Sequence, residues 1–391
     1  MAKNNSFLAK PVNSFYILCI TSISLSILGL IMVFSASSIH SIETNGSSLA
    51  IVARQGLFLL ISIPAAIFVA RVPLFGIKKI ARIGLLISAA LLLCLRIPGI
   101  GKNVNGNTNW ISLGIIDVQP SELVKFLMIL WASLLLARKL DQGTERTNVF
   151  FLIAPGFALV MLLIMAGKDL GTTCVIAAIL AGLLFVSGVE LKLLGWFTAC
   201  CALIFAFFIA TAGYRAQRFL VVLNPFAEGD YKNAGWQPAH SLLGLASGGL
   251  FGVGLGGSRQ KWGNLAEAHT DFIFSVIGEE LGLVGTLAVL ILIGALLLSI
   301  FKISLRASDP FSRFACAGMG SWIAIQTLLN IGSATSLLPV VGVTLPLLSY
   351  GGSALIATFL GIGFVLGTAL RDPEVLRDVR SAVHKRRLHS Q

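Results

Sequence analysis

The chain has very few charged residues for its length. Only 12% of its 391 residues are Asp, Glu, Lys or Arg, whereas 56% are hydrophobic. Its mean hydropathy of +0.89 lies far outside the range of soluble globular proteins. Apolar runs long enough to cross about 30 Å of hydrocarbon recur along the whole chain. The low charge therefore excludes a soluble domain and predicts an all-α polytopic membrane protein.

Cysteine is also scarce and lacks the spacing of a binding motif. The six cysteines lie in apolar runs without C-x-x-C spacing, which favours small core residues over disulfides or metal ligands. No His/Cys cluster suggests a tightly bound structural metal. No small-residue cleavage site follows the first apolar run, so we expect that run to be a retained span rather than a signal peptide.

Ten apolar runs predict ten spanning helices. They lie near 15–37, 50–71, 79–97, 120–138, 149–166, 171–188, 191–212, 272–301, 312–332 and 346–369. We therefore divide the chain into a cytoplasmic N-terminal segment (1–14), a transmembrane domain (15–370) and a basic cytoplasmic tail (371–391). A large outer segment, about 213–271, interrupts the transmembrane domain.

The distribution of Lys and Arg predicts the orientation. If the N-terminus is cytoplasmic, most of the 29 basic residues fall in loops on the cytoplasmic side, and both termini lie there. The net charge of +12 mainly reflects this bias and the basic tail, which suits anionic lipids or a cytoplasmic partner. Nucleic-acid binding is disfavoured because the charge is dispersed among apolar spans.

Two of the three unusual outer segments are short. Segment 98–119 is rich in Asn and Gly, and its alternating residues from Trp110 predict a hairpin at the interface. Trp110 is equally consistent with an interfacial anchor and with a ligand contact. Segment 333–353 carries no charge, and Pro339 and Pro346 prevent a continuous helix. Irregular backbone at membrane depth favours the wall of a cavity over a plain loop.

The third outer segment, 213–271, is too long for an ordinary loop and contains an apolar stretch. These features predict an interfacial or re-entrant helix. Its Gly252-x-Gly254-x-x-Gly257 run lacks the preceding strand and following helix of a dinucleotide site. Close backbone packing is the better interpretation of these glycines.

A cluster of ionisable residues marks the boundary between this segment and the next span. It comprises Glu267, His269, Asp271, Glu279 and Glu280. Ionisable groups at a bilayer boundary are costly and indicate a functional site. Glu280 lies about half a helical turn out of phase with Asp271. We therefore expect at least one glutamate to pair within the bundle. Asp271 itself is either the N-cap of the following helix or a catalytic carboxylate.

Two further charged sites lie near outer span ends. Glu122 and Lys125 are neighbours on one helix face. They form either a structural ion pair or a cation held ready for an anionic ligand. Asp169 either caps the helix that follows it or faces the same cavity as Glu122 and Lys125.

Five short motifs follow one another along the chain. They are Asn105-Gly-x-x-x-Trp110-Ile-x-Leu-Gly, Gln119-Pro-Ser-Glu-Leu-x-Lys125, Asp169-Leu-Gly-Thr, Ala268-His-Thr-Asp-Phe-Ile-Phe274 and Leu345-Pro-Leu-Leu-Ser-Tyr-Gly-Gly-Ser353. In this order they resemble the SEDS proteins of bacterial cell-wall synthesis, and the resemblance covers essentially the whole chain. Lys261-Trp-Gly-x-Leu and Ile277-Gly-Glu-Glu-Leu-Gly282 resemble the division branch more than the elongation or sporulation branches. Ala266 and Lys168 depart from the family pattern, which has Pro at both positions.

The resemblance implies a peptidoglycan glycosyltransferase that polymerises lipid II, an undecaprenyl-pyrophosphate-linked disaccharide peptide, at the outer face of the bacterial plasma membrane. It implies an inverting reaction at the division septum, with Asp271 as the general base. The implied partners are a class B penicillin-binding transpeptidase, other divisome proteins and membrane lipids. Substrate-binding or supporting roles fall on Trp110, Glu122, Lys125, Asp169, Arg215, Arg218, Lys261, Glu267, His269, Ser349 and Tyr350.

The leaving pyrophosphate needs positive charge as its own charge grows. Candidate sources are Lys125, Arg215, Arg218, Arg259 and Lys261, or a divalent cation such as Mg²⁺ or Mn²⁺ associated with Asp271. The alternatives are a lipid II flippase, an elongation-type polymerase and a scaffold for the division machinery. The lack of an internal repeat and the position of the ionisable groups at the outer boundary favour the enzyme over the transporter.

Overall fold

Helices make up most of the computed structural model, which describes residues 10–104, 107–112, 114, 117–143, 146–210 and 213–389. The helices are α1 (Pro11–Asn45), α2 (Ala50–Arg71), α3 (Leu74–Arg82), α4 (Gly84–Cys94), α5 (Pro120–Asp141), α6 (Arg146–Met165), α7 (Leu170–Ser187), α8 (Leu191–Ala210), α9 (Gly213–Leu220), α10 (Trp236–Ser247), α11 (Ile273–Arg306), α12 (Pro310–Ala334), α13 (Gly352–Leu370) and α14 (Pro373–His389). The strands are β1 (Gly101–Val104), β2 (Asn107–Ser112) and β3 (Asp117–Val118).

Helices occupy all ten predicted span positions. Within the described residues, eight of them are long and apolar enough to cross a membrane by themselves. The third position holds the 11-residue α4, which follows α3 after one non-helical residue, Ile83. The fifth holds α6, whose apolar part, Val149–Met165, is shorter than the other spans. The membrane-protein class is thus confirmed, with two short helices among the spans.

The last span begins later than the sequence predicts. We expected it to start at 346, but α13 begins at Gly352. Pro346 has no backbone N–H, and the hydrogen bonds in this stretch are turns, such as Ser349 N to the Leu345 oxygen at 3.0 Å. The residues before Gly352 therefore extend the irregular outer segment.

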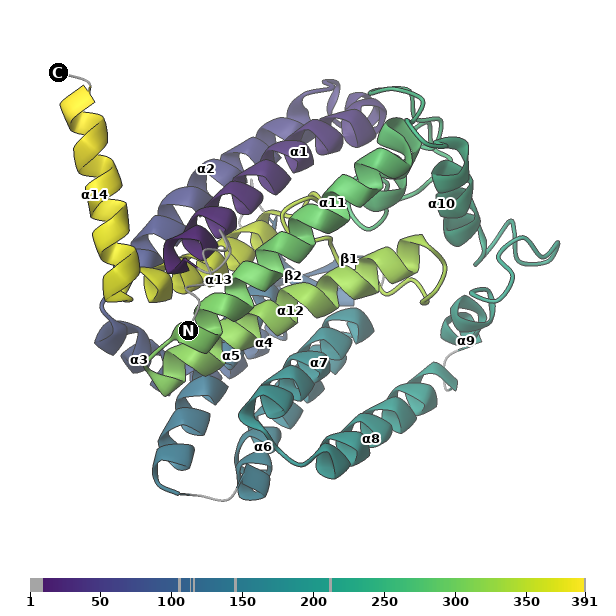
Figure 1. Ribbon diagram of the computed structural model, residues 1–391. Coiled ribbons are helices and arrows are strands. Elements are labelled where there is room, and N and C mark those ends of the chain that lie inside the picture. Colours follow the sequence, from purple (N-terminus) through teal and green to yellow (C-terminus); the bar gives the residue numbers. More distant parts are fainter. Residues whose placement is uncertain are drawn as a thin grey trace.

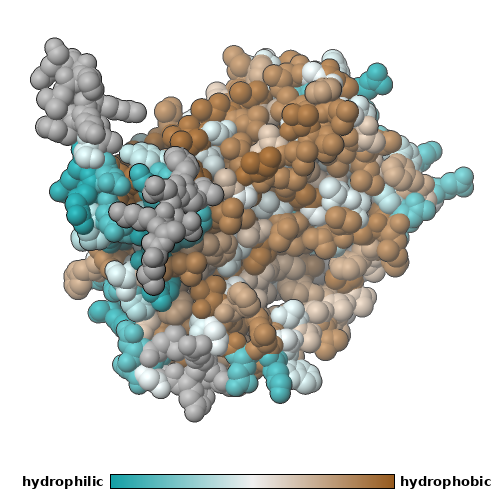
Figure 2. All heavy atoms as spheres, viewed as in Figure 1, coloured by the Kyte–Doolittle hydropathy of each residue, from teal (hydrophilic) through white to brown (hydrophobic). Residues whose placement is uncertain are grey.

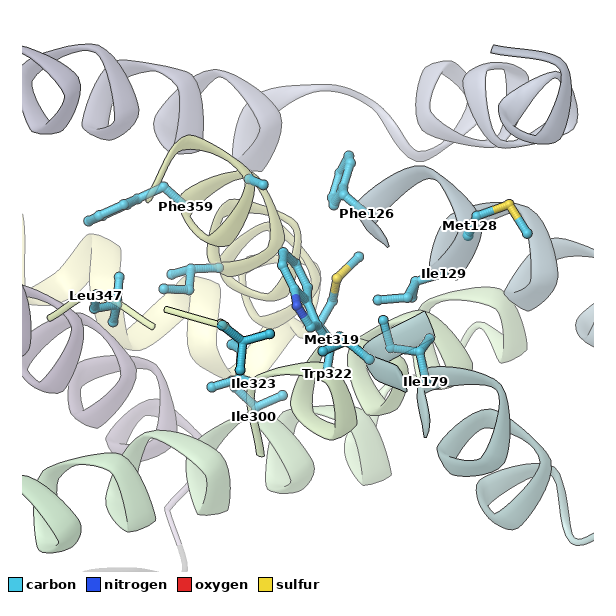
Figure 3. Packing of buried hydrophobic residues seen from close by; sticks show 14 of the residues in the cluster. Phe126, Met128, Ile129, Ile179, Ile300, Met319, Trp322, Ile323, Leu347 and Phe359 are labelled. Carbon is cyan, nitrogen blue, oxygen red and sulfur yellow. The ribbon is translucent and has the colours of Figure 1, made fainter. Parts of the chain in front are cut away.

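Helix α12 lies at the centre of the bundle and contacts α5, α7, α11 and α13, while α1 packs on α11 and α2 on α13 (Figure 1). Figure 3 shows Met319 and Trp322 of α12 lying near Phe126 and Ile129 of α5. Small residues bring some backbones close together. A Cβ on Gly363 of α13 would lie 2.4 Å from the Ala66 oxygen of α2. Without a hydrophobic force between helices in lipid, such close packing supplies the association energy.

Helix α8 stands apart from this bundle. Its main contacts are with α7 and α9, and none of its side chains is buried. In Figure 1 it lies at the lower right, separated from α11 and α12. The face of the molecule seen in Figure 2 is largely apolar, as expected for a surface in contact with lipid.

The two ends of the bundle differ in charge. The beginning of α1, the end of α11 and helices α3 and α14 meet at one end, at the left of Figure 1, which we name the basic end. Its basic residues include Arg71, Lys78, Lys79, Arg82, Lys302, Arg306, Arg313 and Arg371. The beginnings of α2, α7, α11 and α13 lie at the opposite end, which we name the Asp271 end. This grouping follows the predicted pattern; the cytoplasmic location of the basic end remains a prediction.

The outer segments take the expected local forms. Segment 98–119 contains an antiparallel sheet in the order β1-β2-β3, in which Trp110 is the partner of Lys102. Segment 213–271 contains the helices α9 and α10. Segment 333–353 has no helix between Ala334 and Gly352. The predicted hairpin, the predicted helix and the predicted helix break are therefore confirmed.

Candidate active site at the Asp271 end

Asp271 lies just before α11 and does not cap it. The N-cap residue is Phe272, and no side chain makes a capping hydrogen bond there. Of the two sequence interpretations of Asp271, the N-cap is therefore wrong. In the part of the chain that the structure describes, no hydrogen bond or ion pair reaches the Asp271 carboxylate.

The backbone around Asp271 is held by three consecutive carbonyl groups. Tyr350 N donates to the His269 oxygen at 2.9 Å. Ser349 Oγ donates to the Thr270 oxygen at 2.6 Å, and Asn330 Nδ2 donates to the Asp271 oxygen at 2.8 Å. The main chain is therefore fixed while the Asp271 side chain stays unpaired. Of the two predicted supporting residues, Ser349 acts here through its side-chain hydroxyl and Tyr350 through its backbone N–H.

Side chains from two helices hold the segments around Asp271 and Ser349. The buried Gln55 of α2 donates through Nε2 to the Ser349 oxygen at 3.1 Å and accepts from Gly351 N at 3.3 Å. Asn330 of α12 also donates to the Val343 oxygen at 2.7 Å. Sequence reasoning missed Gln55 and Asn330, because uncharged amides in apolar helices carry no signal of their long-range partners.

The surroundings of Asp271 change its acidity. Burial raises its pKa from 3.8 to about 7, Glu267 adds to the rise, and the positive charge of Arg218 opposes it. The irregular segment lies close to the carboxylate, since a Cβ on Gly342 would be 3.6 Å from Oδ2. A carboxylate with a pKa near the working pH is well suited to accept a proton.

Aromatic side chains flank the site. The His269 ring lies 5.6 Å from the ring of His40 on α1, nearly parallel to it. It lies equally far, 5.6 Å, from the Tyr350 ring. Burial lowers the pKa of His269, which favours the neutral imidazole. Burial raises the pKa of Tyr350, and a hydrogen bond with the exposed Arg54 opposes the rise. His40 and Arg54 were not predicted from the sequence.

Glu267 shapes the turn that leads into the site. It has a left-handed backbone conformation, with φ of 57°. Its exposed carboxylate accepts from Thr270 Oγ1 at 2.8 Å. Trp110 lies in the sheet, where the neighbouring Lys102–Asp117 pair at 2.7 Å is half-exposed. The Lys102 hydrogen bond holds the pKa of Asp117 below its usual value.

Glu122 and Lys125 form a buried ion pair on α5. Lys125 Nζ lies 2.7 Å from Glu122 Oε1 and donates to Gln326 Oε1 at 2.9 Å. The same ammonium lies 5.2 Å from the centre of the Trp322 ring, and only 1% of Lys125 is exposed. These contacts supply the structural role of the pair. An anionic ligand reaches Lys125 only if the surrounding side chains move.

Asp169 caps α7. It accepts from Thr172 N at 2.9 Å and from Thr172 Oγ1 at 2.8 Å. Gln119 Nε2 lies 3.5 Å from Oδ2, the oxygen that also accepts from Thr172 Oγ1. Burial raises the pKa of Asp169, and these Thr172 hydrogen bonds oppose the rise. Of the two sequence interpretations, the cap is confirmed.

The other predicted cations differ in their availability. Arg218 is exposed on α9. Lys261 Nζ donates to the Gly256 oxygen at 2.5 Å and lies 3.9 Å from Glu280 Oε1. The side chain of Arg215 lies outside the described residues. Within the described residues, Arg218 therefore has no ion pair and lies near Asp271, whereas Lys261 binds Gly256 and lies near Glu280.

Glu279 and Glu280 are both fully buried within α11. Ser35 Oγ donates to Glu280 at 2.6 Å, and Ser258 Oγ donates to Glu279 at 2.5 Å. Both glutamates therefore pair inside the bundle, as expected for at least one. The ionisable cluster separates into Asp271, with the exposed Glu267 and the half-buried His269, and two glutamates that bind other elements.

Metal ligands are few at this end. Among the described residues, no group of three or more His, Cys, Asp or Glu side chains lies close enough to hold a metal ion. A divalent cation at Asp271 would therefore need phosphate oxygens of a substrate as further ligands. A cavity of 260 Å³ lies instead at the basic end, lined by residues that include Arg306, Asp309 and Arg371. The cavity wall expected from segment 333–353 remains a prediction.

Comparison with known sequences places this site in a wider context. The family described as "Cell cycle protein" (FTSW_RODA_SPOVE) matches residues 15–372. The chain is 37% identical over 377 residues to the "Probable peptidoglycan glycosyltransferase FtsW" of Mycobacterium tuberculosis, covering 96% of this chain and 71% of the relative. It is 36% identical over 362 residues to the "Stage V sporulation protein E" of Bacillus subtilis, covering 90% and 96%.

Solved structures have the same fold. The rod shape determining protein RodA of Thermus thermophilus gives a TM-score of 0.66 with 28% identity, covering 94% of this chain and 98% of that one. A chain from a peptidoglycan synthase complex that coordinates polymerization and crosslinking gives a TM-score of 0.72 with 26% identity, covering 90% and 97%.

Proposed function

Because the chain belongs to the FtsW/RodA/SpoVE family, we propose that it is a peptidoglycan glycosyltransferase that polymerises lipid II with Asp271 as general base. Relatives named as peptidoglycan glycosyltransferases match it over most of its length. The observation that carries the residue assignment is the Asp271 carboxylate, which has a pKa of about 7 and no partner in the described chain.

The reaction joins two lipid-linked sugars. The 4-hydroxyl of one sugar attacks the anomeric carbon of the other, and the bond from that carbon to the pyrophosphate oxygen breaks. Asp271 accepts the hydroxyl proton as the new bond forms. Because this is a direct displacement, the anomeric centre inverts and no covalent enzyme intermediate is needed. The hydrogen bonds to the three carbonyl groups of residues 269–271 favour this role, since they fix the backbone of the base.

Positive charge near Asp271 supports departure of the pyrophosphate. Arg218 and Arg54 are exposed and near the site, whereas Lys125 is buried in its ion pair. The two arginines are therefore better suited than Lys125 to meet a phosphate directly. A divalent cation shared between Asp271 and phosphate oxygens is a second source of charge.

Several finer assignments belong to the same proposal. The Lys261 and Glu279–Glu280 motifs favour a septal role over an elongation role. The likeness to a chain of a synthase complex supports a class B penicillin-binding protein as partner. The basic end would face the cytoplasm, with both termini there. The position of the ionisable groups at one end, instead of mid-bundle, disfavours a flippase.

The test is polymerisation of purified lipid II by the protein with its cognate class B penicillin-binding protein. We expect Asp271→Asn to lose at least about 100-fold in rate, because general-base catalysis contributes this much or more. The matched control is Asp117→Asn, an aspartate at the same end that is paired with Lys102. Full activity of Asp271→Asn, or an equal loss in the control, would refute the assignment. Lipid II transport by the same variants in vesicles separates the flippase alternative.

A further inference from the structure

Helix α11 is broken near its beginning, at Gly282. Gly282 has φ of 68° and ψ of −165°, far from helical values. The break divides α11 into a first piece, residues 273–281, and a second piece, residues 283–306. Asp271 precedes the first piece, which is only about 13 Å long. The short first piece therefore cannot take its orientation from the rest of the helix.

A loop fills the break and replaces the lost helical hydrogen bonds. An intact helix would bond Leu283 N to the Glu279 oxygen and Val284 N to the Glu280 oxygen. Instead, Leu283 N and Val284 N donate to the oxygens of Gly249 and Leu250, at 2.9 and 3.1 Å.

The carbonyl groups released by the break also bind this loop. The Glu279 oxygen accepts from Val253 N at 2.9 Å, and the Glu280 oxygen accepts from Gly254 N at 3.1 Å. Four backbone groups inside a membrane helix are thus satisfied by residues 249–254.

Glycines allow the two backbones to approach so closely. A Cβ on Gly282 would lie 2.4 Å from Gly252 N, and one on Gly252 would lie 2.2 Å from the Glu280 oxygen. Both residues also have positive φ, which other residues rarely adopt. The sequence interpretation of these loop glycines as close-packing residues is confirmed for Gly252.

The side chains of Glu279 and Glu280 bind the continuation of the same loop. Glu279 accepts from Ser258 Oγ at 2.5 Å and from Arg259 N at 2.9 Å. Glu280 accepts from Ser258 N at 3.3 Å and lies 3.9 Å from Lys261 Nζ. We name this set of contacts, between the glutamates and residues 249–261, the glutamate clasp.

The location of the two carboxylates is unfavourable for the stability of the fold. They are buried, adjacent in sequence and at the C-terminal end of the first piece, where the helix dipole disfavours negative charge. Replacing such groups by apolar ones is often neutral or stabilising, so burial of charge is weak evidence for a purely structural role.

We propose that Glu279 and Glu280 are positioning residues for Asp271. The clasp fixes the far end of the first piece, and the hydrogen bonds to the carbonyl groups of residues 269–271 fix the near end. Helix α1 joins both ends, because Ser35 binds Glu280 and His40 stacks on His269. Together these contacts, which we name the frame, orient the carboxylate of Asp271. This inference rests on the proposed function.

The first test compares polymerisation kinetics. Glu279→Gln combined with Glu280→Gln should lower kcat by about 10- to 100-fold, because small misplacement of a catalytic group costs this much. KM should stay within about twofold, since neither residue touches substrate. The control is Ser299→Ala, a buried residue of the second piece whose hydroxyl, among the described residues, bonds only to the Leu296 oxygen of α11. An unchanged kcat in the folded double variant, or a loss carried by KM alone, overturns the proposal.

A milder variant covers the case in which the double variant does not fold. Ser35→Ala removes one hydrogen bond from Glu280 and leaves both carboxylates in place. We expect a smaller fall in kcat, about threefold to tenfold, again with KM nearly constant. Unchanged kcat in this variant as well as in Ser258→Ala would contradict the inference.

A second readout does not depend on activity. The six natural cysteines are replaced, and Asp271→Cys is labelled with a water-soluble maleimide. Adding Glu280→Gln should change the labelling rate at least threefold, whereas adding Ser299→Ala should not. An unchanged labelling rate refutes the positioning role. If the wild-type protein does not polymerise lipid II but labelling does respond, the proposed function fails and the frame around position 271 stands.

Discussion

Two buried acidic sites in this protein are compensated in opposite ways. Glu122 pairs at 2.7 Å with Lys125, which is one turn away on the same helix. Glu280 instead lies 3.9 Å from a more distant cation, Lys261. Both Glu279 and Glu280 depend on hydroxyl and backbone N–H groups from other elements. Compensation within a helix keeps its consequences local. Compensation through a loop makes the order of that loop depend on the buried charge.

The largest expected difference concerns the two lysines. Lys125→Met leaves Glu122 buried without its cation and should lower the free energy of unfolding by about 3–5 kcal/mol. Lys261→Met should cost less than about 2 kcal/mol, because serine hydroxyls and backbone N–H groups still bind Glu279 and Glu280. Denaturant unfolding in detergent measures both. Adding Glu122→Gln to Lys125→Met should recover part of the loss, and equal losses in the two lysine variants would erase the distinction.

A smaller effect is expected from two glycines of α11, one at the break and one in the second piece. Gly282→Ala places a Cβ 2.4 Å from Gly252 N at a positive φ. We expect a loss of about 2–3 kcal/mol in the free energy of unfolding and faster proteolysis of residues 248–261. Gly294→Ala is the matched control, because a Cβ there meets no atom within 4 Å. Wild-type protease resistance in Gly282→Ala would show that the loop does not depend on the break.

Two serines test how much a hydroxyl contributes at a buried carboxylate. Ser258→Ala removes the short hydrogen bond to Glu279 and should cost about 1.5–3 kcal/mol, as is usual for hydrogen bonds to charged groups. The buried hydroxyl of Ser133 on α5 has no partner in the described chain. Ser133→Ala should therefore change the free energy of unfolding by less than about 0.5 kcal/mol. Similar losses in both variants would argue against a specific contribution from the clasp.

The half-buried carboxylate of Asp271 has neither type of compensation among the described residues. The last test is its titration. Its pKa rises from 3.8 to about 7 on folding. If the ionised form is the base, kcat/KM should fall about tenfold per pH unit, about 1.4 kcal/mol, as pH drops below 7. A pH–rate profile measures this limb. A limb near pH 4 would show that Asp271 titrates as an exposed aspartate.

The same shift has a defined sign for stability. Between pH 4 and 7 the folded protein keeps a proton on Asp271 that the unfolded chain releases. The contribution of Asp271 to stability is therefore greatest below its unfolded pKa and is lost as pH rises towards about 7. Asp271→Asn should remove this dependence, which can be measured by unfolding at pH 5 and pH 8.

Local features of the fold were predictable because they depend on short sequence separations. Apolar runs gave the positions of the spans, and Pro339 and Pro346 gave the irregular segment before α13. The Glu122–Lys125 pair follows from helical spacing alone. The start of α13 was placed too early, because Pro346 restricts the backbone without showing where the next helix begins.

Long-range contacts at the site were not predictable in the same way. Gln55 and Asn330 are uncharged residues in apolar helices, and only packing brings them to residues 269–271 and 349–351. The break at Gly282 is also invisible in the sequence, since single glycines occur throughout these helices. Its replacement hydrogen bonds come from a loop about 30 residues earlier in the chain.

The sequence by itself determined the membrane class, the span positions, the basic end and the candidate carboxylate Asp271. These depend on composition, on hydropathy and on charges placed at span boundaries. Only the tertiary structure decided that Asp271 is not a helix cap and that α11 consists of two pieces. It also decided that Glu279 and Glu280 bind residues 249–261, the loop that fills the break. The reason is physical: hydropathy acts on each segment separately, whereas the hydrogen-bond partners of buried polar groups depend on which segments pack together.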